Sequence, residues 1–433
     1  MCRTANFTDF IAEIRLMVHR YFLLFAAVFV FTSVSMHSPA WGFFGHKRIN
    51  RLAVFTLPSE MMPLFKTEIE YITEHAIDPD KRRFAVPAEG FRHYINLDRW
   101  AFLPRERWEA QILHTDIFLV TDKNDTMQLI DNQTIRKIKK DYFLKSKAIR
   151  KLFSRDSIAV ADSFYRRFFI NNLYKIQPDE PLSIAPDSLK NLFRKEQLTL
   201  KGIKSVFAKD RLSINGILPF HLVAVQKQLT EAFAKKDKKR ILKLAAELGH
   251  YLADAHVPLH TTANYNGQLT NQTGIHAFWE SRLPELFADQ RYDFFVGRAE
   301  YIEKPRDFYW EVILESNKLV SNILQMEKEL NLNFPNDQRY CLETINGVAI
   351  QKPCFAYAEA FHDKLNGMVE EQMRRAILAV GSVWYTAWVD AGQPDLSDLK
   401  DTSLSIEDKN EGEMVEKAIQ NGGKMIGRDE GNQ

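Results

Sequence analysis

GHYLADAHVPLH, residues 249–260, is the stretch of sequence that decides the fold. It completes a run from 222 to 254 whose apolar residues recur at three- and four-residue spacing, which is the pattern of an amphipathic helix. His250 and Asp254 then lie on one face of the helix, one turn apart, so both side chains reach one cation. Pro258 disfavours continuation of the helix, and His260 approaches from the following turn. The stretch predicts a helix that carries a metal site.

Helical spacing extends over most of the chain after residue 40. Residues 366–390 repeat the pattern, and alternating strand-like runs are scarce. We therefore predict an all-α, multi-helical domain over residues 41–392, with an insertion of helices at about 100–212. The basic stretch 136–151 in this insertion is typical of a solvated helix face, and attraction of anionic lipid or nucleic acid is the alternative. Residues 393–433 are acidic and rich in Gly, which predicts a disordered tail.

The N-terminus predicts export from the cytoplasm. An uncharged apolar run at 21–34 follows Arg15 and Arg20, and it is too short for a normal membrane span. Small residues at 38 and 40 predict cleavage after Ala40, which makes 1–40 a signal peptide and Trp41 the mature N-terminus of a secreted or periplasmic protein. An uncleaved anchor is the alternative, and Met17 is a second candidate for the start.

Composition limits the partners and the metal ligands. The 58 Lys and Arg nearly balance the 56 Asp and Glu, which excludes a broadly basic chain, but the acidic tail leaves residues 41–393 with a formal charge of +6. Three Cys are too few for a thiolate-rich cluster. After export Cys341 and Cys354 are expected to pair across a short loop, with metal ligation by these thiols as the alternative. A metal site must therefore use His and carboxylates.

A second His/carboxylate pair follows the first along the chain. His276 and Glu280 repeat the four-residue spacing on another apolar helix, and packing alone does not account for both pairs. Imidazole with carboxylate suits zinc, while manganese, iron and nickel remain open on ligand type. The five side chains exceed what one tetrahedral catalytic zinc uses, which predicts at least two metal ions. They are His250, Asp254, His260, His276 and Glu280.

Three upstream motifs complete a family pattern. They are WGFFGH at 41–46, AIDPD at 76–80 and RHYI at 92–95. In this order, with the 249–280 region, they resemble the superfamily that unites bacterial zinc-dependent phospholipases C with fungal and plant zinc-dependent single-strand nucleases. The resemblance covers roughly 41–99 and 213–392. It implies a mostly helical fold, three zinc ions, and a mature chain whose first residue, Trp41, ligates metal through its amine and carbonyl.

The resemblance also implies a ligand set. One zinc is held by Trp41, His46 and a bridging Asp254; a second by Asp78, His93, His250 and the same Asp254; and a third by His260, His276 and Glu280. Asp80 is the alternative to Asp78. Arg82 and Arg83 are candidates for contact with a substrate phosphate, and ion pairs with nearby carboxylates are the equal alternative.

The implied activity is hydrolysis of a phosphodiester by a secreted trinuclear-zinc enzyme. A hydroxide between two zinc ions would attack phosphorus in line, with Asp78 and Asp254 as catalytic residues and the third zinc at the leaving alkoxide. ILPF at 217–220 and Glu280 resemble the phospholipase branch, whereas Trp279 and the short Trp41-to-His46 spacing resemble the nucleases. Phe44 stands where choline-preferring phospholipases have an acidic residue.

We expect a phospholipase C-like enzyme with a phospholipid substrate and transient contact with a membrane surface. A nuclease acting on single-stranded nucleic acid is the alternative, and a non-catalytic secreted zinc-binding protein is a second alternative. We infer no obligate protein partner and no transmembrane segment in the mature chain.

Overall fold

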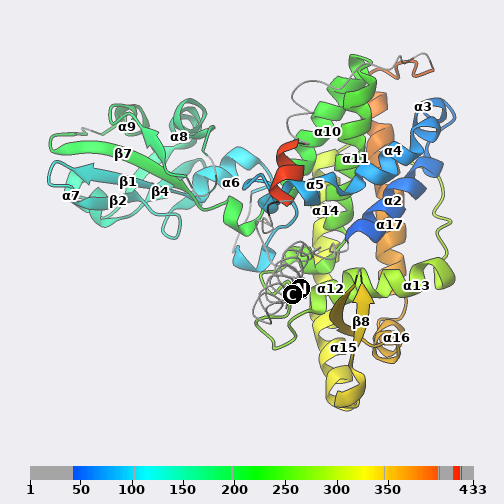
Figure 1. Cartoon of the computed structure of the whole chain (residues 1–433). Coiled ribbons are helices and arrows are strands. Elements are labelled where there is room, and N and C mark those ends of the chain that lie inside the picture. The colour runs from blue at the N-terminus through cyan, green and yellow to red at the C-terminus, as the bar shows by residue number, and fades with distance from the viewer. Residues whose placement is uncertain are drawn as a thin grey trace, which may run out of the picture.

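The protein has two lobes, a helical body and a smaller lobe built by the inserted segment (Figure 1). The structure is a computed structural model that describes residues 42–100, 104–345, 347–399, 413–419 and 421, except Gln177, Asp179, Gln197 and Asp398. Each lobe has its own hydrophobic core. The predicted signal peptide and Trp41 lie outside the described residues.

Long helices build the body. They and the shorter helices around them are α2 (Gly42–Ala53), α3 (Met62–Thr67), α4 (Ile69–Glu74), α5 (Asp78–Arg82), α10 (Leu218–Ala234), α11 (Lys238–Ala255), α12 (Ile275–Ala277), α13 (Leu283–Arg291), α14 (Pro305–Lys318), α15 (Val320–Asn333), α16 (Phe355–Lys364) and α17 (Met368–Asp390). Short helical turns near the site are η2 (His75–Ile77), η3 (Gly90–Arg92), η7 (Pro258–Thr261) and η8 (Phe278–Arg282).

Helix α11 is the centre of the body. It packs against α2, α10, α14 and α17, and nearly all residues of its second half are buried. The Asp237 side chain caps its N-terminus by accepting a hydrogen bond from the Arg240 N–H. The helix ends at Ala255, and Pro258 opens the separate turn η7 that carries His260. The helix end predicted from the sequence is therefore confirmed.

The prediction of an all-α fold is wrong, because the inserted segment is an α/β lobe. Of the residues that the structure describes, 57% are helical and 13% lie in strands. The strands are β1 (Thr115–Thr121), β2 (Thr126–Ile130), β3 (Arg136–Ile138), β4 (Asp141–Leu144), β5 (Ile158–Ala161), β6 (Leu182–Ile184) and β7 (Ile203–Asp210). The helices of the lobe are α6 (Arg107–Leu113), α7 (Lys147–Phe153), α8 (Asp162–Phe168) and α9 (Ser188–Leu192).

Two antiparallel sheets organise this lobe. Their strand orders are β2-β1-β7-β6 and β3-β4-β5. The basic stretch 136–151 is therefore the hairpin β3–β4 followed by α7, and not one helix face. Charged residues interrupt these short strands, which is why their alternation is weak in the sequence.

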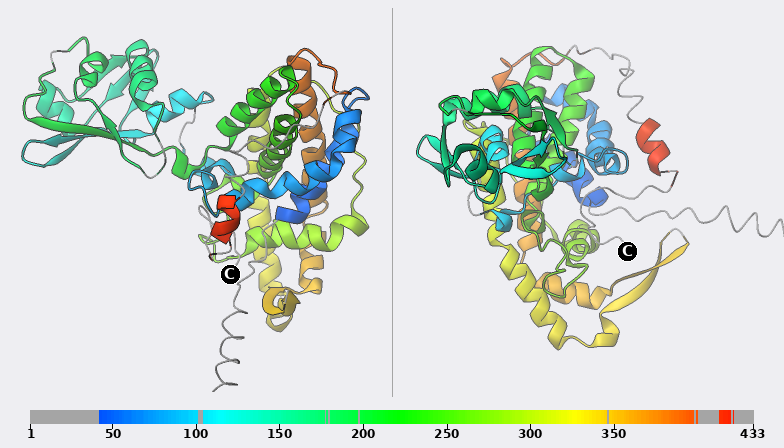
Figure 2. Two further views of the ribbon diagram at one scale, coloured as in Figure 1. Left: turned by 45° about the horizontal axis from the view of Figure 1, so that its top comes forward. Right: turned by 90° about the vertical axis from the view of Figure 1, so that its left-hand side faces the viewer.

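A third, two-stranded sheet is a hairpin in the body. Strands β8 (Tyr340–Ile345) and β9 (Val348–Pro353) pair antiparallel, and the hairpin projects beside α15 and α16 (Figure 2). A disulfide joins Cys341 to Cys354, so the expected pairing is confirmed. Arg282 bonds to Glu343 and to the Pro353 carbonyl, which ties the hairpin to η8.

The C-terminal segment is described only in part. Residues 413–419 form a short helix within the stretch that the sequence predicts to be disordered. Among the described residues, no helix combines the length and the apolar composition that crossing a bilayer requires.

Candidate metal centre

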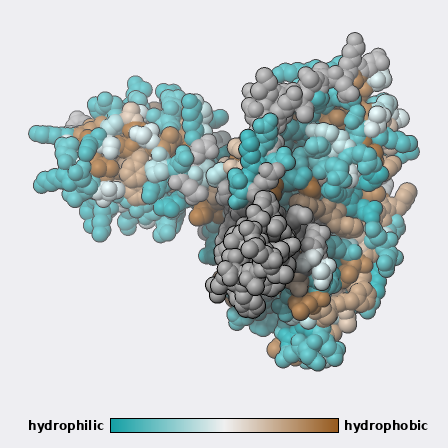
Figure 3. All heavy atoms as spheres, in the orientation of Figure 1, coloured by the Kyte–Doolittle hydropathy of each residue, from teal (hydrophilic) through white to brown (hydrophobic). Residues whose placement is uncertain are grey.

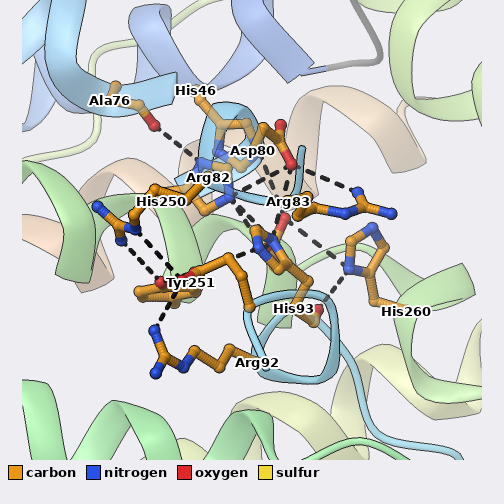
Figure 4. Close-up of polar contacts among 12 residues, drawn as sticks. His46, Ala76, Asp80, Arg82, Arg83, Arg92, His93, His250, Tyr251 and His260 are labelled. Atoms are coloured by element: carbon orange, nitrogen blue, oxygen red, sulfur yellow. Dashed lines mark hydrogen bonds and ion pairs between the residues drawn. The ribbon is translucent and has the colours of Figure 1, made fainter. Parts of the chain in front are cut away.

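Five side chains from four segments converge beside the C-terminal part of α11 (Figure 4). They are His46 on α2, Asp80 on α5, His93 just after η3, and His250 and Asp254 on α11. All five are buried. The four-residue spacing on α11 places its two side chains on one face, as the sequence predicts.

A glycine sets the distance between α2 and α11. A Cβ added at Gly249 would lie 2.0 Å from Oδ1 of Asn50, whose amide donates to the Ala246 carbonyl at 3.0 Å. The close approach brings the rings of His46 and His250 into a stack with centroids 3.8 Å apart. The helix-to-helix contact thus positions two of the candidate ligands.

Asp254 lies at the centre of the group. Its Oδ1 is 3.3 Å from Nε2 of His46, and its Oδ2 is 2.9 Å from Nδ1 of His93 and 3.4 Å from Nε2 of His250. Because its two oxygens face different imidazoles, the carboxylate can bridge two ions.

A second group lies next to the first. His260 on η7, His276 on α12 and Glu280 on η8 bring their ligand atoms together, and all three are buried. Oε2 of Glu280 is 3.3 Å from Nε2 of His260 and 2.8 Å from Nε2 of His276. His276 Nε2 and Glu280 Oε2 nevertheless make no hydrogen bond. Two buried polar atoms that lie close together without a hydrogen bond between them are expected where both bind the same cation.

Backbone carbonyls fix the tautomer of three of these histidines. Nδ1 of His250 lies 2.8 Å from the Ala76 carbonyl, Nδ1 of His260 lies 2.6 Å from the His93 carbonyl, and Nδ1 of His276 lies 3.2 Å from the Tyr265 carbonyl. A carbonyl only accepts, so each Nδ1 carries the proton. Each Nε2 then presents a lone pair to the carboxylates of its group, which is the arrangement of a metal-bound imidazole.

The structure brings Asp80, and not Asp78, into the centre. Asp78 is one-third exposed, and its oxygens lie 2.5 Å from Nδ1 of His75 and 3.2 Å from Nζ of Lys81. Oδ1 of Asp80 is 3.7 Å from Nδ1 of His93 and 3.9 Å from Nε2 of His250. We therefore replace Asp78 by Asp80 as candidate ligand and catalytic carboxylate. Seven other predicted ligands lie in the two groups, and Trp41 lies outside the described residues.

The two arginines after Asp78 make ion pairs within the protein. Nη1 of Arg83 is 3.5 Å from Oδ1 of Asp80. Arg82 binds Glu89 and Glu247 at 3.2 and 2.6 Å and also donates to the Tyr251 hydroxyl. The ion-pair alternative is thus confirmed for both.

Glu89 is a residue of the site that the sequence did not reveal. It is completely buried, binds Arg82, Arg92 and the Tyr251 hydroxyl, and lies 3.6 Å from Nε2 of His93. The signal that could have identified it is its four-residue spacing from His93, which matches the other His/carboxylate pairs. Its carboxylate approaches Nε2 of His93, whereas Asp254 approaches Nδ1 of the same ring.

The shifts in pKa at this centre favour an ionised Asp254 and a neutral His250, which are the forms that bind cations. Although burial opposes its charge, the neighbouring histidines hold the pKa of Asp254 well below its usual range. Burial lowers the pKa of His250, which keeps it neutral. Burial also disfavours charge on His93, but its hydrogen bonds to Asp254 and Glu89 raise its pKa to about 9. Metal binding through His93 must therefore release a proton.

Replacing Glu89 with glutamine is expected to destabilise the protein by about 3–5 kcal/mol, because Arg92 then loses its counter-charge and the buried Arg82 keeps only Glu247. Burial opposes the charge of Glu89, but His93 and the two arginines lower its pKa. Its stabilisation is therefore complete above its ordinary value of 4.5 and is lost as the pH falls below it. Calorimetry in EDTA should show a gap in melting temperature between wild type and E89Q that narrows from pH 7 to pH 3.5.

The matched control is E371Q. Glu371 pairs with Arg375 at 2.7 Å, but both side chains are 53% exposed, so its loss should cost less than about 1 kcal/mol. Equal melting temperatures for E89Q and wild type at pH 7 would contradict a role for Glu89 in holding the site.

No family model, no curated protein and no solved structure matches this chain.

Proposed function

We propose that the protein is a secreted, zinc-dependent phosphodiester hydrolase. The observation that carries the proposal is the convergence of two adjoining buried groups of imidazole nitrogens and carboxylate oxygens, with Asp254 facing three histidines. A purely structural zinc site is closed and four-coordinate, and it does not need this number of ligands. Imidazole with carboxylate is the donor set that zinc accepts.

The residues have separate roles in this proposal. His46, Asp80, His93, His250 and Asp254 hold two ions, with Trp41 as a further ligand, and His260, His276 and Glu280 hold a third. Bound zinc supplies an activated water and neutralises charge on a phosphoryl group. Asp254 keeps the first two ions together, Arg83 orients Asp80, and Glu89 orients His93.

A phospholipid is the substrate that the sequence motifs favour. ILPF at 217–220 has a packing role, since Pro219 lies in the first turn of α10 and Leu218 and Phe220 are buried in the core. Single-stranded nucleic acid is the second candidate, and the basic inserted lobe favours it. Of residues 104–212, 22 are Lys or Arg and 14 are Asp or Glu.

The test is a parallel hydrolysis assay on the purified chain loaded with zinc. We expect release of p-nitrophenolate from bis(p-nitrophenyl) phosphate, loss of this activity in EDTA, and its return with added zinc. Mixed phospholipids and single-stranded DNA and RNA are assayed beside it. Release of diacylglycerol supports the phospholipase C-like activity, whereas cleavage of the oligonucleotides supports the nuclease. A zinc-loaded protein that hydrolyses none of these substrates is a metal-binding protein, and the proposal then fails.

A further inference from the structure

The basic charge of this protein is concentrated in the inserted lobe. Residues 104–212 have an excess of eight cations, whereas the rest of 41–393 has 28 Lys and Arg against 30 Asp and Glu. A single lobe with this charge attracts a polyanion, and the body does not share the attraction. The metal centre lies in the body, so this charge is separate from it.

One face of the β2-β1-β7-β6 sheet is open. The inward residues of β1 and β7, such as Leu119, Val206 and Ala208, are buried in the core of the lobe. On the opposite face Phe118 pairs with Phe207 across the strands, and their rings stack with centroids 5.0 Å apart and an interplanar angle of 16°. Both rings are only half-buried. Figure 3 shows an apolar patch ringed by hydrophilic residues on this lobe.

Polar and cationic side chains surround the stacked rings. Ser183 and Gln128 lie opposite Phe207 and Phe118 in the register of the sheet. Nζ of Lys209 lies 5.7 Å from the centre of the Phe118 ring and 5.9 Å from that of Phe207. Lys209 also lines a cavity of about 210 Å³ at the end of β7, where Lys209 and Arg211 are accompanied by the carboxylates Glu180 and Asp210. The stacked rings are thus followed directly by the Lys209 ammonium group, at the rim of a cavity of mixed charge.

We propose that this sheet face binds single-stranded nucleic acid. A base continues the stack of Phe118 and Phe207, and the adjoining phosphate meets Lys209 beside the rings. Stacking on aromatic rings beside a cationic groove is how proteins hold single strands without reading their sequence. A bilayer would instead require apolar side chains that protrude from the surface, and these two rings lie against each other in the sheet.

The cavity adjoins the body of the protein. The cavity includes Ile214, whose carbonyl accepts a hydrogen bond from the Tyr94 hydroxyl at 3.2 Å. Tyr94 follows the candidate ligand His93 in the chain. A strand bound to the sheet therefore passes close to the body, although the inference concerns binding and does not require hydrolysis.

The experiment measures the fluorescence anisotropy of a labelled 15-nucleotide dT oligomer with the full chain in EDTA, so hydrolysis cannot consume the probe. We expect F118L/F207L to weaken binding by at least about ten-fold, because it keeps apolar volume but removes the rings. K209Q should also weaken binding and reduce its dependence on salt. The matched control is F164L. Phe164 is a partly buried aromatic residue of the same lobe with Lys195 over its ring, but it lies on α8.

Three results would overturn the proposal. The first is wild-type affinity in both F118L/F207L and K209Q, and the second is a duplex that competes as well as the single strand. The third is an oligomer that does not bind while vesicles of phosphatidylglycerol do, which would make the surface a lipid-binding one. If F118L/F207L fails to fold by circular dichroism, K209Q alone decides. Because all arms are free of metal, failure here leaves the hydrolase proposal standing, and failure of hydrolysis leaves this binding unaffected.

Discussion

Replacing Asp254 with asparagine is expected to remove about two of the three proposed zinc ions and to lower hydrolysis at least about 1,000-fold. The carboxylate faces His46 through one oxygen and His93 and His250 through the other, so a neutral amide weakens both positions together. Charge stabilisation by a metal is worth several kcal/mol, and each 1.36 kcal/mol is tenfold in rate. Asparagine has the same size, which keeps the packing around α11.

The measurement is metal content by mass spectrometry of the purified variant, beside its rate on bis(p-nitrophenyl) phosphate. E280Q is the matched comparison, since Glu280 contacts His260 and His276 but not the first group. It should lose about one ion and keep the other two. A D254N protein with full zinc content and normal turnover would show that the centre is assigned to the wrong residues, and equal losses in D254N and E280Q would show that the groups are not separate.

The second prediction with a large effect distinguishes Asp80 from Asp78, which lies two residues before it in the chain. D80N is expected to weaken zinc binding at least about 100-fold, because loss of an outer-shell partner already costs up to about that much and Asp80 is itself a candidate ligand. D78N should stay within about two-fold of wild type, because it loses only partly exposed contacts to His75 and Lys81. The pair is well matched, since both residues lie on α5 and undergo the same chemical change.

Zinc affinity is measured by competition with a chromophoric chelator, and the melting temperature of each variant in EDTA checks its fold. Arg83 is buried beside Asp80, so D80N should also melt lower than D78N. Loss of zinc affinity in D78N but not in D80N would restore the ligand that the sequence motif favours and would contradict the placement of α5.

The sequence predicted those candidate ligands whose positions follow from helix geometry. His250 and Asp254 are four residues apart on a helix, and His276 and Glu280 repeat the spacing, so their convergence requires no knowledge of tertiary structure. The choice between Asp78 and Asp80 does not follow from helix spacing. Both lie on the five-residue helix α5, and the turn η2 before it decides which carboxylate faces inward. A sequence motif that contains both residues does not show which of the two faces inward.

The inserted lobe was mispredicted for a related physical reason. Its strands are three to eight residues long and are stabilised by pairing between distant segments, as when Phe118 on β1 meets Phe207 on β7. Such pairing does not require a regular alternation of apolar and polar residues, and the charged residues in these strands obscure what alternation there is. Glu89 was missed, although it lies four residues before His93, because its partners Arg82 and Tyr251 meet only after α5 packs on α11. Local pattern found the helices of the body, and contacts between distant segments decided the rest.

The contact at Gly249 has a consequence for how this sequence can drift over evolutionary time. Any other residue at 249 would collide with Asn50, and moving α2 outward to make room would separate His46 from His250. Position 249 therefore tolerates as few residue types as the position of a metal ligand, although glycine has no side chain that binds a metal. A substitution at 50 that shortens the side chain would open space for a larger residue at 249, since the three atoms nearest the added Cβ all belong to Asn50.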